Sequence, residues 1–222
     1  GVTGTDPDVC DNDVVTLYGE DLPSGADFSG TPGNPATGTF TWVTDYDDAG
    51  VYYVRFIARD NHAPELADTV VVEITVNNVN RPPVISVPPA QVVDEGGSLS
   101  FDVSATDPDG DNLSFSAEGL PSGATFVDNG NGTGTFSFDP DYCQAGVYQV
   151  TFIVVDDGSP QLADTGVVQV TVVDVNRRPE ISDPGPQVVD EGDTLVFGVT
   201  GTDPDVCDND VVTLYGEDLP SG

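Results

Sequence analysis

Closely spaced aspartates are the residues of this sequence best suited to do chemistry. They stand two positions apart in DPDGDN, as Asp107 and Asp109, and again in DPDVCDND, as Asp203 and Asp205. Carboxylates that converge raise one another's pKa unless a cation lies between them. Ca²⁺ takes about 6–8 oxygen ligands, mostly carboxylates and carbonyls. The spacing therefore favours cation binding, and solvated turn residues are the plainer alternative.

The charge balance of the chain is extreme. Its 222 residues include 39 acidic side chains against 5 arginines and no lysine, which gives a net charge of −34. Nucleic acid is excluded as a partner, because binding phosphates needs a basic face. Solubility, a salt-adapted surface and divalent cations each explain such acidity. Disorder is disfavoured, because 37% of the residues are hydrophobic and many alternate regularly along the chain.

Catalytic groups are scarce. The chain has one histidine, His62 in the turn DNHAPE, and no Ser/His/Asp set. Many carboxylates stand in pairs, but nothing separates a general acid from a base. Trp42 lies in the alternating stretch GTFTWVTD, which favours packing over a sugar-stacking platform. We therefore expect no enzyme, and no run approaches the ~18–20 apolar residues of a membrane span.

The sequence repeats itself. Residues 198–222 are identical to residues 1–25, so the period is 197 residues. A weaker repeat within the period, including LPSGA, LADT and VNR, divides it into parts of 96 and 101 residues. Internal repeats predict a string of similar units. We expect a domain at 1–80 that lacks its first strands, a complete domain at 81–176, and the beginning of the next domain at 177–222.

The local pattern predicts strands. Stretches such as SLSFDVSATD (98–107) and VYQVTFIVVD (147–156) alternate apolar and other residues with period two. NGNGTG (129–134) is typical of a tight hairpin turn. Glycine and proline are too frequent for amphipathic helices. The prediction is an all-β chain of sandwiches, each with about seven strands.

The order of the acidic motifs resembles that of cadherin-like and bacterial Ig-like tandem repeats, over essentially the whole chain. The motifs are VVDEG, the DPD loops, DYD before the sixth strand, an aspartate that ends this strand, and the linker DVN before arginine and proline. The resemblance implies Greek-key β-sandwiches arranged end to end, with Ca²⁺ held at their junctions. The implied ligands of the first junction are Asp45, Asp47, Asn78, Asn80, Asp107, Asp109 and Asp156. Those of the second junction are Glu95, Asp141, Asp174, Asn176, Asp203 and Asp205. Junctions shared with adjacent periods take Asp6, Asp8, Asp60 and Glu191.

The linkers depart from the cadherin pattern. A cadherin linker has a further Asp-Asn pair before its proline, whereas this chain has Arg81 in one linker and Arg177 with Arg178 in the other. The change removes ligands and adds positive charge. We therefore expect one or two ions at each junction instead of three.

The three cysteines mark differences between the two kinds of domain. Cys143 stands where the other domain has Asp47, and Cys207 lies in a DPD loop that is three residues longer than its counterpart. The family topology places both at the second junction, so the simplest pairing is a Cys143–Cys207 disulfide, with Cys10 paired likewise to the preceding period. Such a bridge implies an oxidising, extracellular setting. Links between neighbouring filaments are the open alternative, and without histidine nearby a zinc site is disfavoured.

These observations predict a structural subunit of an extracellular or cell-surface fibre. Calcium would stiffen its junctions, and its role would be matrix building, as in a biofilm, or cell adhesion. Its partners would be further copies of itself, in a filament that can bundle laterally, with glycans as further candidates. Spacer repeats of an adhesin or extracellular enzyme, and a carbohydrate-binding module, are the alternatives.

Overall fold

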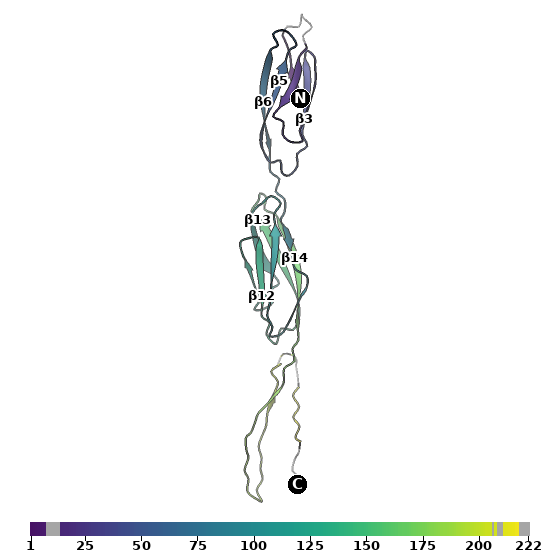
Figure 1. Ribbon diagram of the computed structural model, residues 1–222. Coiled ribbons are helices and arrows are strands. Elements are labelled where there is room, and N and C mark those ends of the chain that lie inside the picture. The colour runs from purple at the N-terminus through teal and green to yellow at the C-terminus, as the bar shows by residue number, and fades with distance from the viewer. Residues whose placement is uncertain (8–13, 206, 208–210, 218–222) are drawn as a thin grey trace. The chain divides into compact units, whose positions relative to one another are not determined.

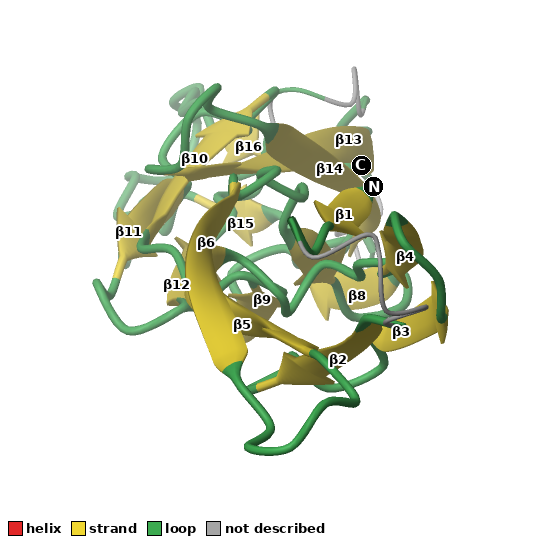
Figure 2. Cartoon of the chain, turned by 90° about the horizontal axis from the view of Figure 1, so that it is seen from above, coloured by secondary structure: helices red, strands yellow, loops and turns green. Residues whose placement is uncertain are grey.

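The computed structural model describes residues 1–7, 14–205, 207 and 211–217. These residues form strands, turns and loops, and Figure 2 shows no helix among them. The all-β fold predicted from the alternating pattern is confirmed. The chain divides into two compact units, Gly1–Val79 and Asn80–Gly222. The predicted third domain, residues 177–222, falls within the second unit, so the three-part division stays a prediction.

The first unit has two three-stranded sheets, with the orders β1-β4-β3 and β2-β5-β6. The long antiparallel pair β5 and β6 is marked in Figure 1. Its strands are β1 (Val2–Gly4), β2 (Thr16–Glu20), β3 (Asp27–Thr31), β4 (Ala36–Thr41), β5 (Gly50–Arg59) and β6 (Ala67–Val76).

The second unit contains a sandwich of two four-stranded sheets, with the orders β10-β13-β14-β8 and β11-β12-β9-β7. Its strands are β7 (Val84–Ser86), β8 (Gln91–Asp94), β9 (Leu99–Thr106), β10 (Leu113–Glu118), β11 (Thr125–Asp128), β12 (Thr133–Phe138), β13 (Gly146–Asp156) and β14 (Ala163–Val173). β8 pairs with β14 in parallel, whereas β7 joins the opposite sheet through β9. The first segment of this sandwich therefore contributes one strand to each sheet.

The two units share one plan over six strands. Strands β1 to β6 correspond in order and pairing to β9 to β14. Among the described residues of the first unit, no strand corresponds to β7 or β8.

The core of the second sandwich is formed by alternate residues of its inner strands. Val150, Phe152 and Val154 of β13 are fully buried, as are Phe136 and Val170 from facing and neighbouring strands. The ring of Phe101 stacks on that of Phe136, with ring centroids 4.7 Å apart. Burial of each such side chain stabilises the fold by about 1.5–3 kcal/mol. This core fixes the two ends of β13, where the acidic motifs lie.

Beyond β14 the second unit continues with little regular structure. β15 (Glu180–Ile181) pairs with β16 (Gly201–Thr202), and residues 182–200 between them contain no strand. Their pairing, Glu180 with Thr202, repeats the register of β7 with β9, where Val84 pairs with Thr106. This short pair therefore repeats the register of the complete sandwich, and the start of a further domain at residue 177 stays a prediction.

Candidate functional site: the two ends of the second sandwich

The acidic motifs of the second unit lie at opposite ends of β13. We call one the Asn80 end; it comprises Asn80, Arg81, Asp107, Asp109, Asp111 and Asp156. We call the other the Cys143 end; it comprises Glu95, Tyr142, Cys143, Arg177, Asp205 and Cys207. β13 begins near Cys143 and ends at Asp156, so its 11 residues span about 36 Å between the two ends.

At the Asn80 end, hydrogen bonds hold Asp107 through one carboxylate oxygen and Asn80 through its amide nitrogen. Oδ1 of Asp107, which follows β9, accepts the backbone N–H of Asp109 at 2.7 Å and that of Asp111 at 3.3 Å. Nδ2 of Asn80 donates to Oδ2 of Asp156 at 3.0 Å and to the carbonyl of Pro160 at 2.9 Å. These bonds fix the directions in which the remaining side-chain oxygens point.

Three buried oxygens at this end have no hydrogen-bond partner. They are Oδ1 of Asn80, Oδ2 of Asp107 and Oδ2 of Asp111. Asn80 is 8% exposed. Buried polar atoms are nearly always paired, so unpaired ones require an explanation. A bound cation would explain three acceptors that have no donor.

The pKa values of two carboxyl groups show how charge is distributed at this end. Burial raises the pKa of Asp111, and the negative charge of Asp107 raises it further, with smaller contributions from Asp157, Asp156 and Asp109. The pKa of Asp109 is lowered, mainly by its hydrogen bond from the Arg81 side chain. Arg81 donates Nε and Nη2 to Asp109 Oδ1 at 2.9 and 2.7 Å and its backbone N–H to Oδ2 at 2.7 Å. Arg81 therefore compensates Asp109, whereas Asp107 and Asp111 repel each other.

The donor set fits a hard divalent cation. Two carboxylate oxygens and one amide oxygen are ligands that Ca²⁺ accepts, and backbone carbonyls and water commonly complete its shell. Among the described residues, no three side chains drawn from His, Cys, Asp and Glu form a metal-binding group. The third oxygen of this set comes instead from an asparagine.

Gly158 allows Asn80 to lie where it does. A Cβ atom at this position would collide with the amide group of Asn80. The backbone N–H of Gly158 also donates to Asp156 Oδ1, at 3.1 Å. The turn after β13 thus needs a glycine here for Asn80 to approach Asp156.

The other residues predicted for the first junction belong to the first unit. Asp45 Oδ1 accepts the backbone N–H of Asp47 at 2.9 Å, and its own N–H donates to Asp48 Oδ2 at 2.8 Å. Asn78 is exposed just before the boundary between the units. Their assignment as calcium ligands stays a prediction.

At the Cys143 end the structure contains a disulfide. Cys143 and Cys207 are bonded across a sequence separation of 64, with their Cα atoms 5.4 Å apart. Oδ1 of Asp141 accepts the backbone N–H of Cys143 at 2.9 Å and so fixes the turn that carries it. The bridge fastens the long DPD loop to the sandwich.

Arg177 makes the main polar contacts beside this bridge. Its backbone N–H donates to Asp205 Oδ2, its Nε donates to Asp205 Oδ1 at 2.6 Å, and its Nη2 donates to the carbonyl of Pro204. Its guanidinium lies over the ring of Tyr142, 3.9 Å from the centroid, in a cation–π contact. The hydrogen bonds from Arg177 lower the pKa of Asp205, which is 2% exposed. A buried carboxylate at this end is thus paired with a fixed cation of the chain itself.

Glu95 is buried at the same end and bonded to backbone groups. It is 4% exposed, and Oε1 accepts the N–H groups of Gln144 and Ala145 at 2.9 and 2.7 Å. Oε2 accepts the N–H of Val175 at 3.2 Å. Glu95 thereby ties the Cys143 turn to the segment that follows β14.

Four further residues were predicted as ligands of the second junction. Oδ1 of Asp203 accepts the backbone N–H of Asp205 at 2.9 Å, as Asp107 does for Asp109. Asp141, Asp174 and Asn176 are exposed. Calcium binding by this set stays a prediction.

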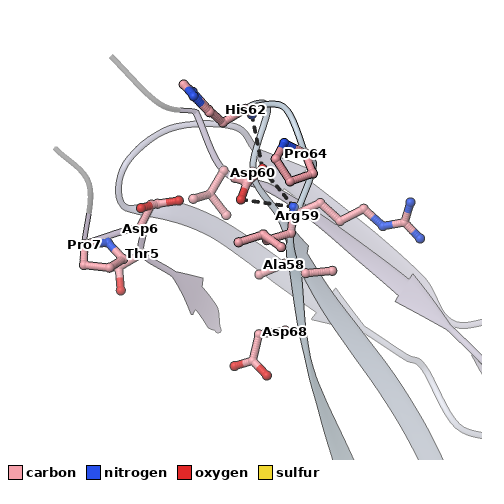
Figure 3. Close-up of a pocket in the computed structure, with 12 residues that line it drawn as sticks. Thr5, Asp6, Pro7, Ala58, Arg59, Asp60, His62, Pro64 and Asp68 are labelled. Carbon is pink, nitrogen blue, oxygen red and sulfur yellow. Dashed lines mark hydrogen bonds between the residues drawn. The ribbon is translucent and has the colours of Figure 1, made fainter. Parts of the chain in front are cut away.

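The first unit carries a related acidic hollow. Asp6 and Asp60 line it together with His62, as the close-up in Figure 3 shows. Oδ1 of Asp60 accepts the backbone N–H groups of His62 and Leu66, each at 3.1 Å. Asp8 and Cys10 lie outside the described residues, and Glu191 is exposed in a turn.

Sequence reasoning did not include three residues that matter at these ends. Asp111 continues the alternation of Asp107 and Asp109 by one step, and that spacing was the available signal. The contacts of Tyr142 and the fit of Gly158 left no signal in the sequence. Trp42, by contrast, packs as predicted: its ring lies edge-on to Tyr52, with centroids 4.7 Å apart, and its Nε1 donates to the carbonyl of Ser24.

Comparison with known proteins gives this architecture a family context. Residues 80–171 match the family described as Bacterial Ig domain. The chain is 32% identical over 192 residues to the Cadherin EGF LAG seven-pass G-type receptor 3 of Mus musculus, which covers 79% of this chain and 6% of the receptor. It is also 32% identical over 195 residues to the Protocadherin-like wing polarity protein stan of Drosophila melanogaster, covering 80% of this chain and 5% of that protein. The chain thus spans only a small part of the length of these relatives.

Among solved structures, extracellular cadherin domains 1–5 of protocadherin gamma B2 superpose with a TM-score of 0.51. The identity is 23%, and the match covers 73% of this chain and 34% of that one. The sandwich topology and the sequence similarity together support a cadherin-like, Ig-like repeat, and the family match covers residues 80–171. In the part of the chain that the structure describes, no helix has the length and apolar character needed to cross a bilayer.

Proposed function

We propose that this chain is a structural, non-enzymatic repeat of an extracellular fibre, and that Ca²⁺ binds at the Asn80 end of its second unit. The observation that carries the calcium proposal is the set of three buried oxygens without partners, on Asn80, Asp107 and Asp111. The raised pKa of Asp111 adds to it, because a cation would relieve the repulsion between the two carboxylates.

The extracellular setting has two supports. Disulfides such as Cys143–Cys207 persist in oxidising compartments. The related solved structure is named as a set of extracellular cadherin domains. The names of the relatives contain cadherin or protocadherin, which supports adhesion or matrix building rather than catalysis.

The residues of the Asn80 end suggest what the ion would do. Asn80 is the first residue of the second unit, and its amide is already held by Asp156 and Pro160. Bound Ca²⁺ would give the three oxygens that accept no hydrogen bond a positively charged partner. Asn80 and the DPDGDN loop would then be fixed together, and the chain would be ordered at the residue where the unit begins.

Calcium titration of the whole chain by isothermal calorimetry tests this proposal. We expect Asp111→Asn to weaken binding at least about tenfold, because it removes one of two carboxylates. Without calcium the same variant should melt at a higher temperature than the unmodified chain, since repulsion from Asp107 is relieved. Glu118→Gln, at an exposed position of β10, makes the same charge change and should alter neither quantity.

Two results would count against a calcium centre here. The first is unchanged affinity in Asp111→Asn. The second is equal loss in Asp111→Asn and Glu118→Gln, which would show that net acidity alone attracts the ion.

A further inference from the structure

Two stretches of the second unit carry the motif Asn-X-Ser/Thr, in which the asparagine is the acceptor of N-linked sugars. They are NLS at 112–114 and NGT at 131–133. Both asparagines are exposed, and each lies just before a strand, β10 in one case and β12 in the other. The motif alone does not distinguish the two positions, but the contacts of their side-chain amides do.

Asn112 is held by a carboxylate. Its Nδ2 donates to Oδ2 of Asp157 at 2.8 Å, and its backbone N–H donates to Oδ1 of the same carboxylate at 2.8 Å. These two hydrogen bonds lower the pKa of Asp157, so the group that accepts them is charged. Transfer of a sugar to Asn112 would first have to free its amide from a charge-assisted hydrogen bond, which is stronger than a neutral one.

Asn131 has the opposite arrangement. It lies in the turn between β11 and β12, and its Oδ1 accepts the hydroxyl of Thr133 at 2.7 Å. In the part of the chain that the structure describes, Nδ2 of Asn131 donates no hydrogen bond. The hydroxyl that the motif requires thus already lies against the amide. The nitrogen that would receive the sugar stays accessible.

Neighbouring groups hold this turn in one shape. Oδ1 of Asp128 accepts the backbone N–H of Gly130 at 2.9 Å, and the backbone N–H of Asn129 donates to the carbonyl of Thr133 at 3.0 Å. Nδ2 of Asn129 also donates to Oγ1 of Thr133 at 2.9 Å and so fixes the hydroxyl. Gly130 has a positive φ of 70°, which glycine adopts without strain, and a Cβ atom there would meet nothing within 4 Å. The turn therefore presents its asparagine to open space on a fixed backbone.

We propose that Asn131 is an N-glycosylation site and that Asn112 is not. In the reaction Nδ2 attacks C1 of a sugar that is activated as a diphosphate ester. The bond from C1 to Nδ2 forms, the bond from C1 to the phosphate oxygen breaks, the diphosphate leaves with the bonding electrons, and Nδ2 gives up one proton to a base of the transferase. The producing cell supplies the sugar diphosphate and the transferase. The inference rests on the proposed extracellular setting, because such sugars are found on the surface of secreted proteins.

The modified turn would lie at the Asn80 end of the sandwich. The carbonyl of Gly132 accepts the backbone N–H of Ala105 at 3.0 Å, and Asp107 follows two residues later. N-linked sugars are bulky and solubilising. Modification would thus put a hydrated group beside the loop that carries the proposed calcium ligands.

Digestion with endoproteinase Asp-N tests the inference on the chain purified from the organism that produces it. Cleavage before each aspartate gives residues 111–127 with one motif and residues 128–138 with the other. Mass spectrometry with fragmentation that keeps sugars on the peptide then locates them. We expect sugar on Asn131 with an occupancy at least about tenfold higher than on Asn112, because the amide of Asn112 must first leave a hydrogen bond to a charged group.

Variants produced in the same organism sharpen the test. Asn131→Gln and Thr133→Val should each abolish the modification, whereas Thr133→Ser should keep it, because serine retains the hydroxyl of the motif. Asn112→Gln is the matched control and should leave the sugar on residues 128–138 unchanged. Sugar that persists on this peptide in Asn131→Gln would be attached to a hydroxyl group and would overturn the inference.

Residues 128–138 without sugar, or equal occupancy of the two motifs, would also overturn it. The same digest reports on the extracellular setting, because residues 141–155 and 205–207 stay linked while the Cys143–Cys207 disulfide is intact. An unmodified turn beside an intact disulfide would remove the glycosylation site alone. Free cysteines would count against the extracellular setting as well.

Discussion

The Asn80 end and the Cys143 end of the second unit are built on the same motif, in which an arginine after the linker asparagine binds the second aspartate of a DPD loop. Arg81 binds Asp109 at one end, and Arg177 binds Asp205 at the other. They differ in the residues that follow the loop. At the Asn80 end, Asp111 adds a buried oxygen without a partner. At the Cys143 end the loop is longer and carries Cys207, which is bonded to Cys143.

One repeat can thus hold the loops at its two ends in two different ways. A cluster of carboxylate oxygens without hydrogen-bond partners is stabilised by a bound cation, so its stability depends on the cation concentration in the surrounding solution. A carboxylate paired with an arginine, in a loop fastened by a covalent bridge, has its charge compensated within the chain itself. Alternation of the two along a chain would give joints that respond differently to chelators and to reductants.

Removing the bridge should have the largest effect. In a chain with Cys10→Ser, the further change Cys143→Ser should lower the free energy of unfolding of the second unit by up to about 4 kcal/mol, since the closed loop spans 64 residues. Trypsin cleavage after Arg177 should accelerate, because the turn and the DPD loop are no longer joined. Cleavage after Arg59, in the first unit, is the internal control.

The contrast between the ends would fail if Cys143→Ser left cleavage after Arg177 unchanged. It would also fail if cleavage after Arg59 rose equally, since the bridge would then act on the whole chain.

At each end a buried carboxylate also accepts at least two backbone hydrogen bonds. Glu95 accepts three N–H groups, and Asp156 accepts those of Gly158 and Leu162 as well as the amide of Asn80. Glu95→Ala and Asp156→Ala should each cost about 2–4 kcal/mol in urea unfolding, because buried donors lose their acceptor. Stabilisation by added calcium should persist in Glu95→Ala and disappear in Asp156→Ala, in which Asn80 loses its support. Equal calcium responses would remove this distinction between the ends.

The sequence predicted the fold and part of each end for physical reasons that can be stated. Strand alternation and turn residues are local properties, and they suffice for an all-β chain. The DPD spacing marked Asp107 and Asp109, and the comparison of repeats pointed to Cys143 and Cys207. The arginines were expected to remove ligands, but the binding of Asp205 by Arg177 depends on where the loop lies. Asp111 matters through burial, and Gly158 through the space that Asn80 needs; neither is visible before the chain is folded.

Conservative changes of the arginines should have smaller effects. Arg177→Lys should cost about 1–2 kcal/mol, because lysine loses the planar set of donors to Asp205 and the stacking on Tyr142. Arg81→Lys should cost less, because its partner Asp109 is 6% exposed, against 2% for Asp205, and solvent weakens the pair more. Urea unfolding of both variants gives the comparison. An equal cost would mean that Tyr142 adds nothing at the Cys143 end.

The smallest effect should appear in calcium affinity when the arginine that binds the DPD loop is neutralised, at one end or at the other. Arg81→Gln removes a positive charge beside the three free oxygens and releases Asp109, so affinity should rise about fivefold, as expected for one charge a few ångströms away in a partly exposed site. Arg177→Gln makes the same change about 36 Å away along β13, beyond the screening length of physiological salt. It should leave the affinity of the Asn80 end unchanged in calorimetric titration. A matching rise in both variants would show that calcium affinity follows the net charge of the whole chain. The Asn80 end would then not be a distinct calcium-binding site.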